Sequence, residues 1–305
     1  MSTLSLLQFV SSIALIYFSA ELIIRYGKVI ALSMGVSRYI VGLTLIAFGT
    51  SFPEFVVSIN ASIMQESGIV FGNIMGSNIA NIGLVLGLCA AIYSVATGNI
   101  KKEDLAFFLL SAILGFVFSW NGVISRFEGI ILLLVFLLYC FFIKRNIADS
   151  QSGEKKSLRK SIDIYILIII ACSFFILIVG SDLFIESAIE IATSLGVSKV
   201  AISMTMVAIG TSLPELATSV IAILKKEYGL LTGNIIGSNI MNILMVLGPS
   251  SIIRSIEVDI SYLPLILMLS LTFLVASFSL FNVRFSRVMG FVLLIIYSTF
   301  VYSNF

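Results

Sequence analysis

Long apolar runs follow one another along the whole chain, and each is close to the ~20 residues that a helix needs to cross the hydrocarbon core of a bilayer. Polar breaks separate the runs. This pattern predicts ten membrane-spanning helices, and the longest polar break, at 144–161, divides them into five and five. The predicted ranges are 3–24, 38–63, 69–94, 104–121, 125–143, 162–185, 199–224, 230–253, 262–281 and 285–303.

The two halves are copies of one sequence. A shift of 161 positions aligns residues 44–87 with residues 205–248 without a gap. The matched phrases are Gly49-Thr50-Ser51-Phe52-Pro53-Glu54 with Gly210-Thr211-Ser212-Leu213-Pro214-Glu215, Gly72-Asn73 with Gly233-Asn234, Gly76-Ser77-Asn78-Ile79 with Gly237-Ser238-Asn239-Ile240, and Asn81 with Asn242. An ungapped match of this length indicates internal duplication. We therefore predict a first repeat at 1–143, a linker at 144–161 and a second repeat at 162–305.

Each half contains five spans, so the two copies must cross the membrane in opposite directions. Inverted repeats with a site between them at mid-membrane are typical of secondary transporters. When the loop 144–161 is placed in the cytoplasm, only Arg126, Lys199 and Arg254 of the 18 basic residues lie outside, as the positive-inside rule requires. The prediction is an all-α protein of the cell membrane, with ten transmembrane helices in two inverted repeats and its N-terminus outside.

The composition narrows the possible functions. With 59% hydrophobic residues, 11% charged residues and a mean hydropathy of +1.14, the chain has no room for a soluble domain of useful size. A net charge of +2 suggests no nucleic-acid partner. The absence of histidine excludes His-based metal sites and proton relays. An intramembrane protease needs two Asp or a Ser with a His, and here the Asp residues are few and peripheral. We therefore expect neither an enzyme nor a bound cofactor.

Two glutamates, Glu54 and Glu215, end the duplicated phrase inside predicted spans. An ionisable side chain at membrane depth is costly and is usually functional. The proline before each glutamate removes a backbone donor and frees a carbonyl one turn back, and such backbone is tolerated where it lines a wet cavity or is packed in protein. Carboxylate, hydroxyl and carbonyl oxygens are the ligands that hard cations prefer.

Further polar residues recur at helical spacings on the same spans. Spacings of three and four predict that they share a face with each glutamate. In the first half these residues are Ala47, Thr50, Ser51 and Glu54 on the second span and Ser77 and Asn81 on the third. In the second half they are Ala208, Thr211, Ser212 and Glu215, followed by Ser238 and Asn242. Inverted symmetry is expected to bring these four segments together in one oxygen-rich pocket.

The charge of this pocket predicts how it works. Two carboxylates balance one divalent cation, whereas an empty pocket holds two buried anions at a high desolvation cost. Such a carrier should resist changing access while it is empty and move readily when it is filled, which is the condition for exchange rather than uniport. Protons should compete with the cation, because protonation also neutralises the pocket.

Helix packing or a cation channel would also account for some of these residues. A single Ser, Thr or Asn in a span can simply join helices, but two glutamates at matched positions in the same phrase favour a site. Glu21 and Asp182 lie near the ends of their predicted spans, where they would face headgroups or a vestibule. A cation channel could also use intramembrane glutamates. It would more naturally be an oligomer with one filter, so inverted duplication disfavours it.

At these motifs the sequence resembles the calcium/cation antiporters and, within them, the sodium/calcium exchangers. The phrases GTSFPE and GTSLPE, followed by GNIMGSNIAN and GNIIGSNIMN, are similar to the two alpha repeats of that family. The resemblance covers nearly the whole chain. It implies exchange of Na⁺ for Ca²⁺ by alternating access, typically with three Na⁺ per Ca²⁺, in which the first and sixth spans slide past the core. A single chain supplies both halves of the site, so a monomer suffices.

The resemblance also implies a set of ligands. Ca²⁺ would be held by Glu54, Glu215, Thr50 and Thr211. Na⁺ would be held by the same two glutamates together with Ala47, Ser51, Ser77, Asn81, Ala208, Ser212, Ser238 and Asn242, where the two alanines contribute backbone carbonyls. A lipid bilayer and these two ions are the expected partners.

Two departures from the family pattern qualify this expectation. Several relatives, including potassium-dependent ones, have Asp where this chain has Asn242, so the chain is expected to be potassium-independent. With two carboxylates and the family stoichiometry, transport would carry one net charge per cycle. The 144–161 loop is also too short to hold the regulatory calcium-binding domains of animal exchangers. A proton/calcium antiporter is the second candidate. It ranks below a sodium/calcium exchanger because the proton/calcium branch of the superfamily has different motifs around its acidic residues.

Overall fold

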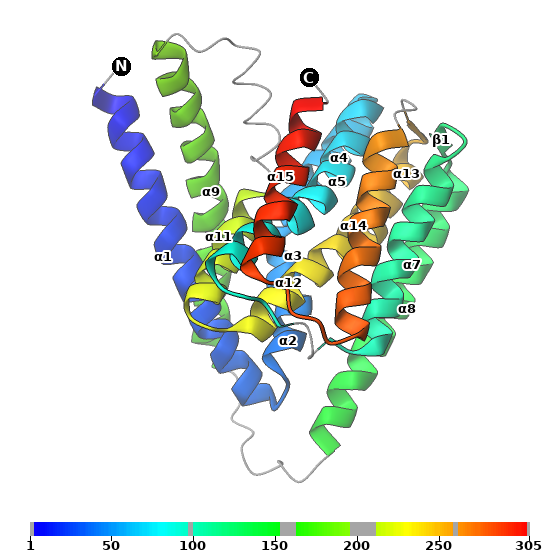
Figure 1. Cartoon of the computed structure of the whole chain (residues 1–305), viewed down its shortest axis with the longest axis horizontal. Coiled ribbons are helices and arrows are strands. Elements are labelled where there is room, and N and C mark those ends of the chain that lie inside the picture. The colour runs from blue at the N-terminus through cyan, green and yellow to red at the C-terminus, as the bar shows by residue number, and fades with distance from the viewer. Residues whose placement is uncertain (1–2, 97–99, 153–162, 196–211, 259–261, 304–305) are drawn as a thin grey trace.

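The computed structural model describes residues 3–96, 100–152, 163–195, 212–258 and 262–303. Nearly all described residues are helical (Figure 1). The first half contains α1 (Thr3–Met34), α2 (Arg38–Val41), the π-helical η1 (Gly42–Ile46), α3 (Ala47–Thr50), α4 (Phe52–Met64), α5 (Ser67–Ala80), the π-helical η2 (Asn81–Leu86), α6 (Gly87–Ile92), α7 (Lys102–Ser119) and α8 (Arg126–Ser152). The second half contains α9 (Ile164–Ser194), α11 (Leu213–Leu224), α12 (Tyr228–Met241), the π-helical η4 (Asn242–Leu247), α13 (Gly248–Ile253), α14 (Tyr262–Leu280) and α15 (Arg287–Ser303).

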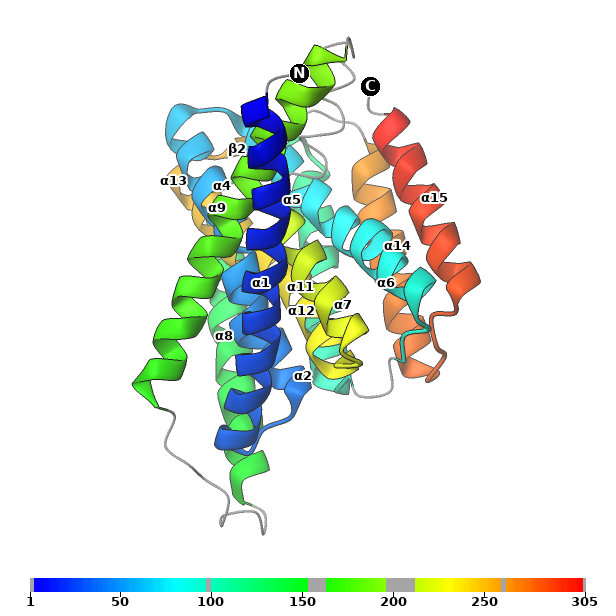
Figure 2. The same cartoon turned by 90° about the vertical axis from the view of Figure 1, so that its left-hand side faces the viewer.

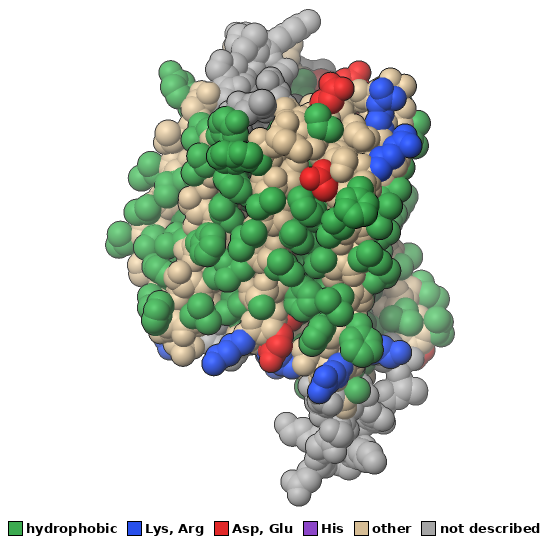
Figure 3. All heavy atoms as spheres, turned by 90° about the vertical axis from the view of Figure 1, so that its right-hand side faces the viewer, with side chains coloured by type: hydrophobic (Ala, Val, Ile, Leu, Met, Phe, Trp, Pro, Cys, Tyr) green, Lys and Arg blue, Asp and Glu red, His purple; other side chains and the backbone are tan. Residues whose placement is uncertain are grey.

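Six described helices are long and apolar enough to cross a membrane, and the bent pair Arg38–Thr50 and Phe52–Met64 would make a seventh. Figure 3 shows one face of the molecule, on which hydrophobic side chains form a wide band and basic side chains lie above and below it. This distribution is that of a protein embedded in a bilayer.

The first, fifth and sixth helices extend beyond their predicted ends. Helix α8 continues to Ser152, into the predicted linker 144–161, rather than ending near residue 143. Helix α1 continues to Met34 rather than ending near residue 24, and α9 continues to Ser194 rather than to residue 185. Hydropathy marks only the lipid-facing part of a helix, and the polar continuation stays helical because no proline interrupts it. Helices α1 and α9 cross and pack along each other in front of the remaining bundle (Figure 2).

The second span is broken rather than continuous. Helix α3 ends at Thr50, Ser51 adopts φ −83° and ψ 3°, and α4 starts at Phe52, with a bend of 42° between the two parts. Pro53 lies in the first turn of α4, where a proline starts a helix without losing a hydrogen bond. The prediction that Ala47 to Glu54 share one continuous helix face is therefore wrong, and these residues instead flank a bend.

The last helix of each half packs on the other half. Helix α15, at the end of the second half, packs on α6 of the first, whereas α8, at the end of the first half, packs on α13 of the second. Both contacts depend on glycines related by the 161-residue shift. A Cβ added at Gly290 would lie 2.7 Å from the Gly87 carbonyl oxygen, and one added at Gly129 would lie 2.7 Å from the Gly248 carbonyl oxygen.

The prediction of a purely helical chain needs a small correction. Strands β1 (Val123–Ile124) and β2 (Ile256–Glu257) form an antiparallel pair in which Ile124 faces Ile256. An isolated bridge joins Val95 and Phe285. The 161-residue shift converts one pairing into the other, so the duplication holds even for the connections between helices. Extended segments can pair only when their partners are brought together in space, which hydropathy does not reveal.

Candidate cation-binding site

Both glutamates lie in the first turn of a helix. Glu54 is in α4 after Ser51, and Glu215 is in α11 after Ser212, which has nearly the same backbone angles as Ser51, φ −89° and ψ 4°. The start of a helix carries a partial positive charge that favours a carboxylate. Each carboxylate is nevertheless almost completely removed from solvent, with an exposed fraction of 0% for Glu54 and 1% for Glu215.

Side chains of both halves meet around these carboxylates. The Ser77 hydroxyl donates to Glu54 Oε1 at 3.4 Å, within the first half. The Ser51 hydroxyl donates across the halves to Glu215 Oε1 at 3.3 Å, and the hydroxyls of Thr50 and Ser238 lie 3.4 Å apart. The structure therefore brings together second-span and third-span residues of the two repeats, as the inverted duplication predicts.

Several buried polar atoms of this cluster have no hydrogen-bond partner in the described part of the chain. They are Glu54 Oε2, Glu215 Oε2, Ser212 Oγ, and the amide oxygen and nitrogen of both Asn81 and Asn242. Buried polar atoms are normally hydrogen-bonded, and a group that is not calls for an explanation such as an ion or a water. Other unpartnered hydroxyl and amide atoms occur elsewhere in the described core, but both unpartnered carboxylate oxygens belong to these glutamates.

The cluster carries an unbalanced negative charge. The ion pairs of the described residues involve Glu21 and Glu227 but neither Glu54 nor Glu215. The two site carboxylates are close enough to repel each other. In the described residues no group of three or more Asp, Glu, His or Cys side chains could hold a metal. Any cation bound here would therefore use two carboxylates together with hydroxyl, amide or carbonyl oxygens, the ligand types that Na⁺ and Ca²⁺ accept.

Asn73 and Asn234, to which the sequence alone assigns no role, hold the two helices that carry the glutamates, α4 and α11. Asn73 donates to the Glu54 carbonyl oxygen at 3.2 Å and to Ser58 Oγ at 2.9 Å. Its counterpart Asn234 donates to Thr218 at 3.3 Å and to Ser219 at 3.2 Å, and its Oδ1 accepts from Thr50 at 3.2 Å. The identity of the two Gly-Asn pairs under the 161-residue shift was a signal that could have identified them.

Close backbone packing brings α12 against the first half of the broken second span. A Cβ added at Gly233 would lie 2.3 Å from the Tyr39 carbonyl oxygen, and one added at Gly237 would lie 2.4 Å from that of Leu43. Only glycine permits this approach, which places Ser238 beside Thr50. On another side, the ring of Phe174 from α9 lies against Gly49, where a Cβ would come within 2.3 Å of it.

The remaining predicted residues have different outcomes. Ala208 and Thr211 lie outside the described residues. The Ala47 carbonyl accepts the Ser51 N–H at 3.0 Å and the Thr50 hydroxyl at 3.4 Å, so it is already engaged within the bend. Glu21 forms an ion pair with Lys225 at the end of α11, and Asp182 is exposed on α9.

Comparison with known proteins agrees with this architecture. The fold and the buried polar cluster define a membrane protein of ion transport, built from a duplicated helical unit. A model of the sodium/calcium exchanger protein family matches residues 4–144 and 165–305, and the chain belongs to that family.

Individual proteins are similar to this chain over most of their length. The sodium/calcium exchanger MaX1 of Methanosarcina acetivorans is 32% identical over 302 residues, which cover 85% of each chain. The inner membrane protein YrbG of Escherichia coli is 32% identical over 256 residues, which cover 80% of this chain and 78% of that one. Among solved structures, the sodium-calcium exchanger NCX_Mj soaked with 10 mM Na⁺ and zero Ca²⁺ superimposes with a TM-score of 0.87 at 30% identity and covers 99% of each chain.

Proposed function

We propose that this protein exchanges Na⁺ for Ca²⁺ across the cell membrane by alternating access. One observation carries the proposal: two buried carboxylates, one from each repeat, each keep an oxygen without a partner among the described residues. Oxygen atoms left in this way at the junction of two inverted repeats suit a transported cation. The names of MaX1 and NCX_Mj, both sodium/calcium exchangers, support the same two ions.

We assign the ligands from the cluster and from the family motifs. Ca²⁺ is bound by Glu54 and Glu215 with the hydroxyls of Thr50 and Thr211. Na⁺ ions use the two carboxylates and the surrounding oxygens of Ala47, Ser51, Ser77, Asn81, Ala208, Ser212, Ser238 and Asn242. The unpartnered amides of the two asparagines in this set support their assignment, because a buried amide without a partner is otherwise costly.

The charge of the site determines the electrical character of the cycle. With two carboxylates, the site is neutral when it holds one Ca²⁺ and carries a charge of +1 when it holds three Na⁺. One net charge therefore crosses the membrane per cycle. Asn81 and Asn242 add no third carboxylate, which supports potassium independence. The empty site leaves two repelling anions in the protein interior, so the empty carrier does not change access.

We also propose a membrane topology, which the positions of the chain ends support. The proposal has ten spans, with residues 1–143 and 162–305 as the two five-helix repeats and the linker 144–161 in the cytoplasm. The start of α1 and the end of α15 lie at the same end of the molecule, as an even number of spans requires (Figure 1). We place this end outside the cell. Helices α1 and α9 are the pair that moves relative to the core.

Calcium uptake into proteoliposomes tests this proposal. Vesicles loaded with Na⁺ are diluted into sodium-free buffer containing radioactive Ca²⁺, and uptake is expected only with the outward Na⁺ gradient. Equal rates with choline in place of potassium would support potassium independence. Uptake that ignores Na⁺ but follows an outward proton gradient would identify a proton/calcium antiporter instead. Uptake without any counter-ion would identify a channel or a uniporter.

A further inference from the structure

A cluster of ion pairs lies where the end of α11 meets the start of α12. Glu227, the residue before α12, pairs with the Lys28 ammonium at 3.0 Å and with the Arg38 guanidinium. Lys225, two residues earlier, pairs with Glu21. Glu21 and Lys28 both belong to α1, which is a moving helix in the proposed function. The cluster therefore joins a moving helix to the core, on the cytoplasmic side under the proposed topology.

The core side of this cluster is firmly built. Lys226 has a positive φ of 57°, and the Glu227 N–H donates to the Ala222 carbonyl at 2.8 Å, so the turn between α11 and α12 is tight. The apolar window of the span that begins with α12 is 100% buried, compared with 28% for that of α1. The ion pairs therefore hold a peripheral helix against a fixed point of the bundle.

Arg38 allows the cluster to open without leaving a buried charge unpaired. Only 5% of Glu227 is exposed, so an unpaired carboxylate there would be costly. Arg38 lies in α2, at the start of the second span, and so remains with the core beside Glu227 when α1 moves away. The side chains of Lys28, Glu21 and Lys225 are between 32% and 44% exposed, so they can be hydrated when their pairs break. The pairs made by α1 can thus break and form again in each transport cycle.

The duplication does not repeat these charges. The 161-residue shift places Ile189 at the position of Lys28, and Met64 at that of Lys225. In a carrier built from inverted repeats, the two access states interchange the conformations of the two halves, so a contact that both halves can form favours neither state. A contact that only one half can form favours the state that contains it.

We propose that the pairs Lys28–Glu227 and Glu21–Lys225 form a latch that stabilises this position of α1 over the position that it takes in the opposite access state. The inference rests on the proposed function, in which α1 moves, but the position of α1 can be measured without transport. Because ion pairs with exposed partners are weak, each pair is expected to favour the latched position about threefold.

The distance between α1 and the core tests the latch directly. Leu32→Cys, exposed near the end of α1, and Lys102→Cys, exposed at the start of α7, provide sites for two spin labels. Cys140→Ser and Cys172→Ser remove the exposed native thiols. Double electron–electron resonance then measures the distance between the labels. With saturating Ca²⁺, when the loaded carrier can change access, the wild type should favour the distance of the latched position.

Neutralising either pair should shift this distribution. Lys28→Gln and Glu21→Gln should each increase the population of the second distance about threefold, and the double variant should increase it about tenfold. Glu21→Lys combined with Lys225→Glu reverses both charges of one pair and should restore the wild-type distribution. A role in packing alone would not be restored by this reversal.

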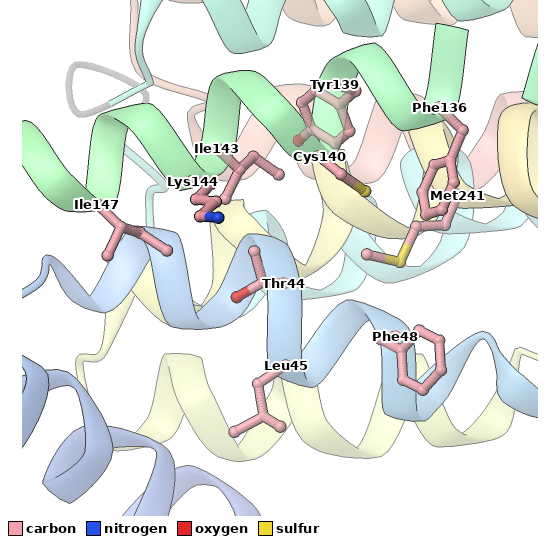
Figure 4. A pocket seen from close by; sticks show the side chains of 10 residues that line it. All are labelled: Thr44, Leu45, Phe48, Phe136, Tyr139, Cys140, Ile143, Lys144, Ile147 and Met241. Atoms are coloured by element: carbon pink, nitrogen blue, oxygen red, sulfur yellow. The ribbon is translucent and has the colours of Figure 1, made fainter. Parts of the chain in front are cut away.

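Two controls separate the latch from a general effect of charge. Arg25→Gln removes an exposed charge from the same part of α1, and Arg25 joins no ion pair of the described residues. Lys144→Gln removes a charge whose side chain lines a groove between α8 and the first part of the second span (Figure 4). Both controls should keep the wild-type distribution.

The outcomes distinguish the latch from the proposed function. Unchanged distances in Lys28→Gln and Glu21→Gln would overturn the latch, as would an equal shift in Arg25→Gln or no restoration by the reversed pair. Absence of sodium-dependent calcium uptake by the wild type would instead contradict the proposed function, and the distances would still show whether the ion pairs hold α1.

Discussion

Helix α5 with its continuation η2–α6, and helix α12 with its continuation η4–α13, are two copies of one segment. Both change from α-helical to π-helical hydrogen bonding at the asparagine that ends the motif, Asn81 in the first copy and Asn242 in the second. Both asparagines are buried, and their amides have no partner within the part of the chain that the structure describes. The copies differ in how a second asparagine is used. Asn234 binds Thr50 of the other repeat, whereas the Oδ1 of Asn73 has no partner in the described chain.

The two copies share their backbone conformation but not their side-chain hydrogen bonds. The backbone, including a π-helical stretch of a kind often found at functional sites, is the same in both copies. The side-chain hydrogen bonds are not, because Ser51 donates to Glu215 of the second repeat, whereas the hydroxyl of its counterpart Ser212 has no partner among the described residues. Thr50 also reaches the second repeat, through Asn234. The site is therefore one unit shared by two repeats rather than two separate half-sites, and the following predictions test this conclusion.

The largest effect is expected from neutralising either carboxylate. Glu54→Gln and Glu215→Gln should each reduce sodium-dependent calcium uptake by roughly 100-fold or more, since removing one charged partner from a buried site typically costs several kcal/mol. Glu66→Gln is the control, because Glu66 is exposed at the end of the same span. If one of the two site variants kept normal uptake, the shared site would be wrong.

A smaller effect is expected from the supporting asparagines, and it should differ between them. Asn234→Ala removes the partner of three hydroxyls, so the apparent KM for Ca²⁺ should rise about tenfold, whereas Asn73→Ala should raise it only about threefold. Asn60→Ala, on the exposed side of α4, should have no effect. The measurement is the calcium dependence of initial uptake rates, with the maximal rate kept.

A double variant shows whether Asn234 acts through Thr50. In a Thr50→Val background, Asn234→Ala should add less to the KM for Ca²⁺ than it does in the wild type, because the shared hydrogen bond is already lost. Fully additive effects would mean that Asn234 is only a packing residue.

Proton competition should be a further, graded effect. Protonation of Glu54 or Glu215 removes one of the two charges that attract the cation, so the KM for Ca²⁺ should rise as the pH falls while the maximal rate at saturating Ca²⁺ stays constant. The check is a series of uptake curves at decreasing pH in vesicles without a proton gradient. A falling maximal rate at constant KM would contradict competition at the site.

The smallest effect is expected at α8 and α15, the helices that each pack on the other half. Gly129→Ala and Gly290→Ala should each destabilise the protein by about 1–3 kcal/mol, because both place a Cβ against a carbonyl oxygen of the other half. Gly68→Ala is the control, since no described atom lies within 4 Å of a Cβ added there. Thermal unfolding of the purified protein is the measurement. Destabilisation by only one of the two variants would mean that the two helices do not pack equivalently on the opposite halves.

The sequence predicts this architecture well where hydropathy and duplication carry the information. The helices agree with most predicted spans to within a few residues, and Pro53 correctly marks the broken second span. The π-helical stretches were not predictable. Nor was the packing of α8 and α15 on the opposite halves, because a repeat in sequence does not say which copy a helix packs on. The ligand set stays a prediction, and Asn73 and Asn234 were visible as identities whose hydrogen bonds only the structure shows.

The charge carried per cycle is the most direct test of a site with two shared carboxylates. Calcium uptake by Na⁺-loaded vesicles would be measured at membrane potentials set by a potassium gradient and valinomycin. Because the proposed exchange moves one net positive charge out of the vesicle for each Ca²⁺ that enters, uptake should be faster with a positive than with a negative interior. Equal rates, or faster uptake with a negative interior, would contradict a site that is neutral with Ca²⁺ and singly positive with Na⁺.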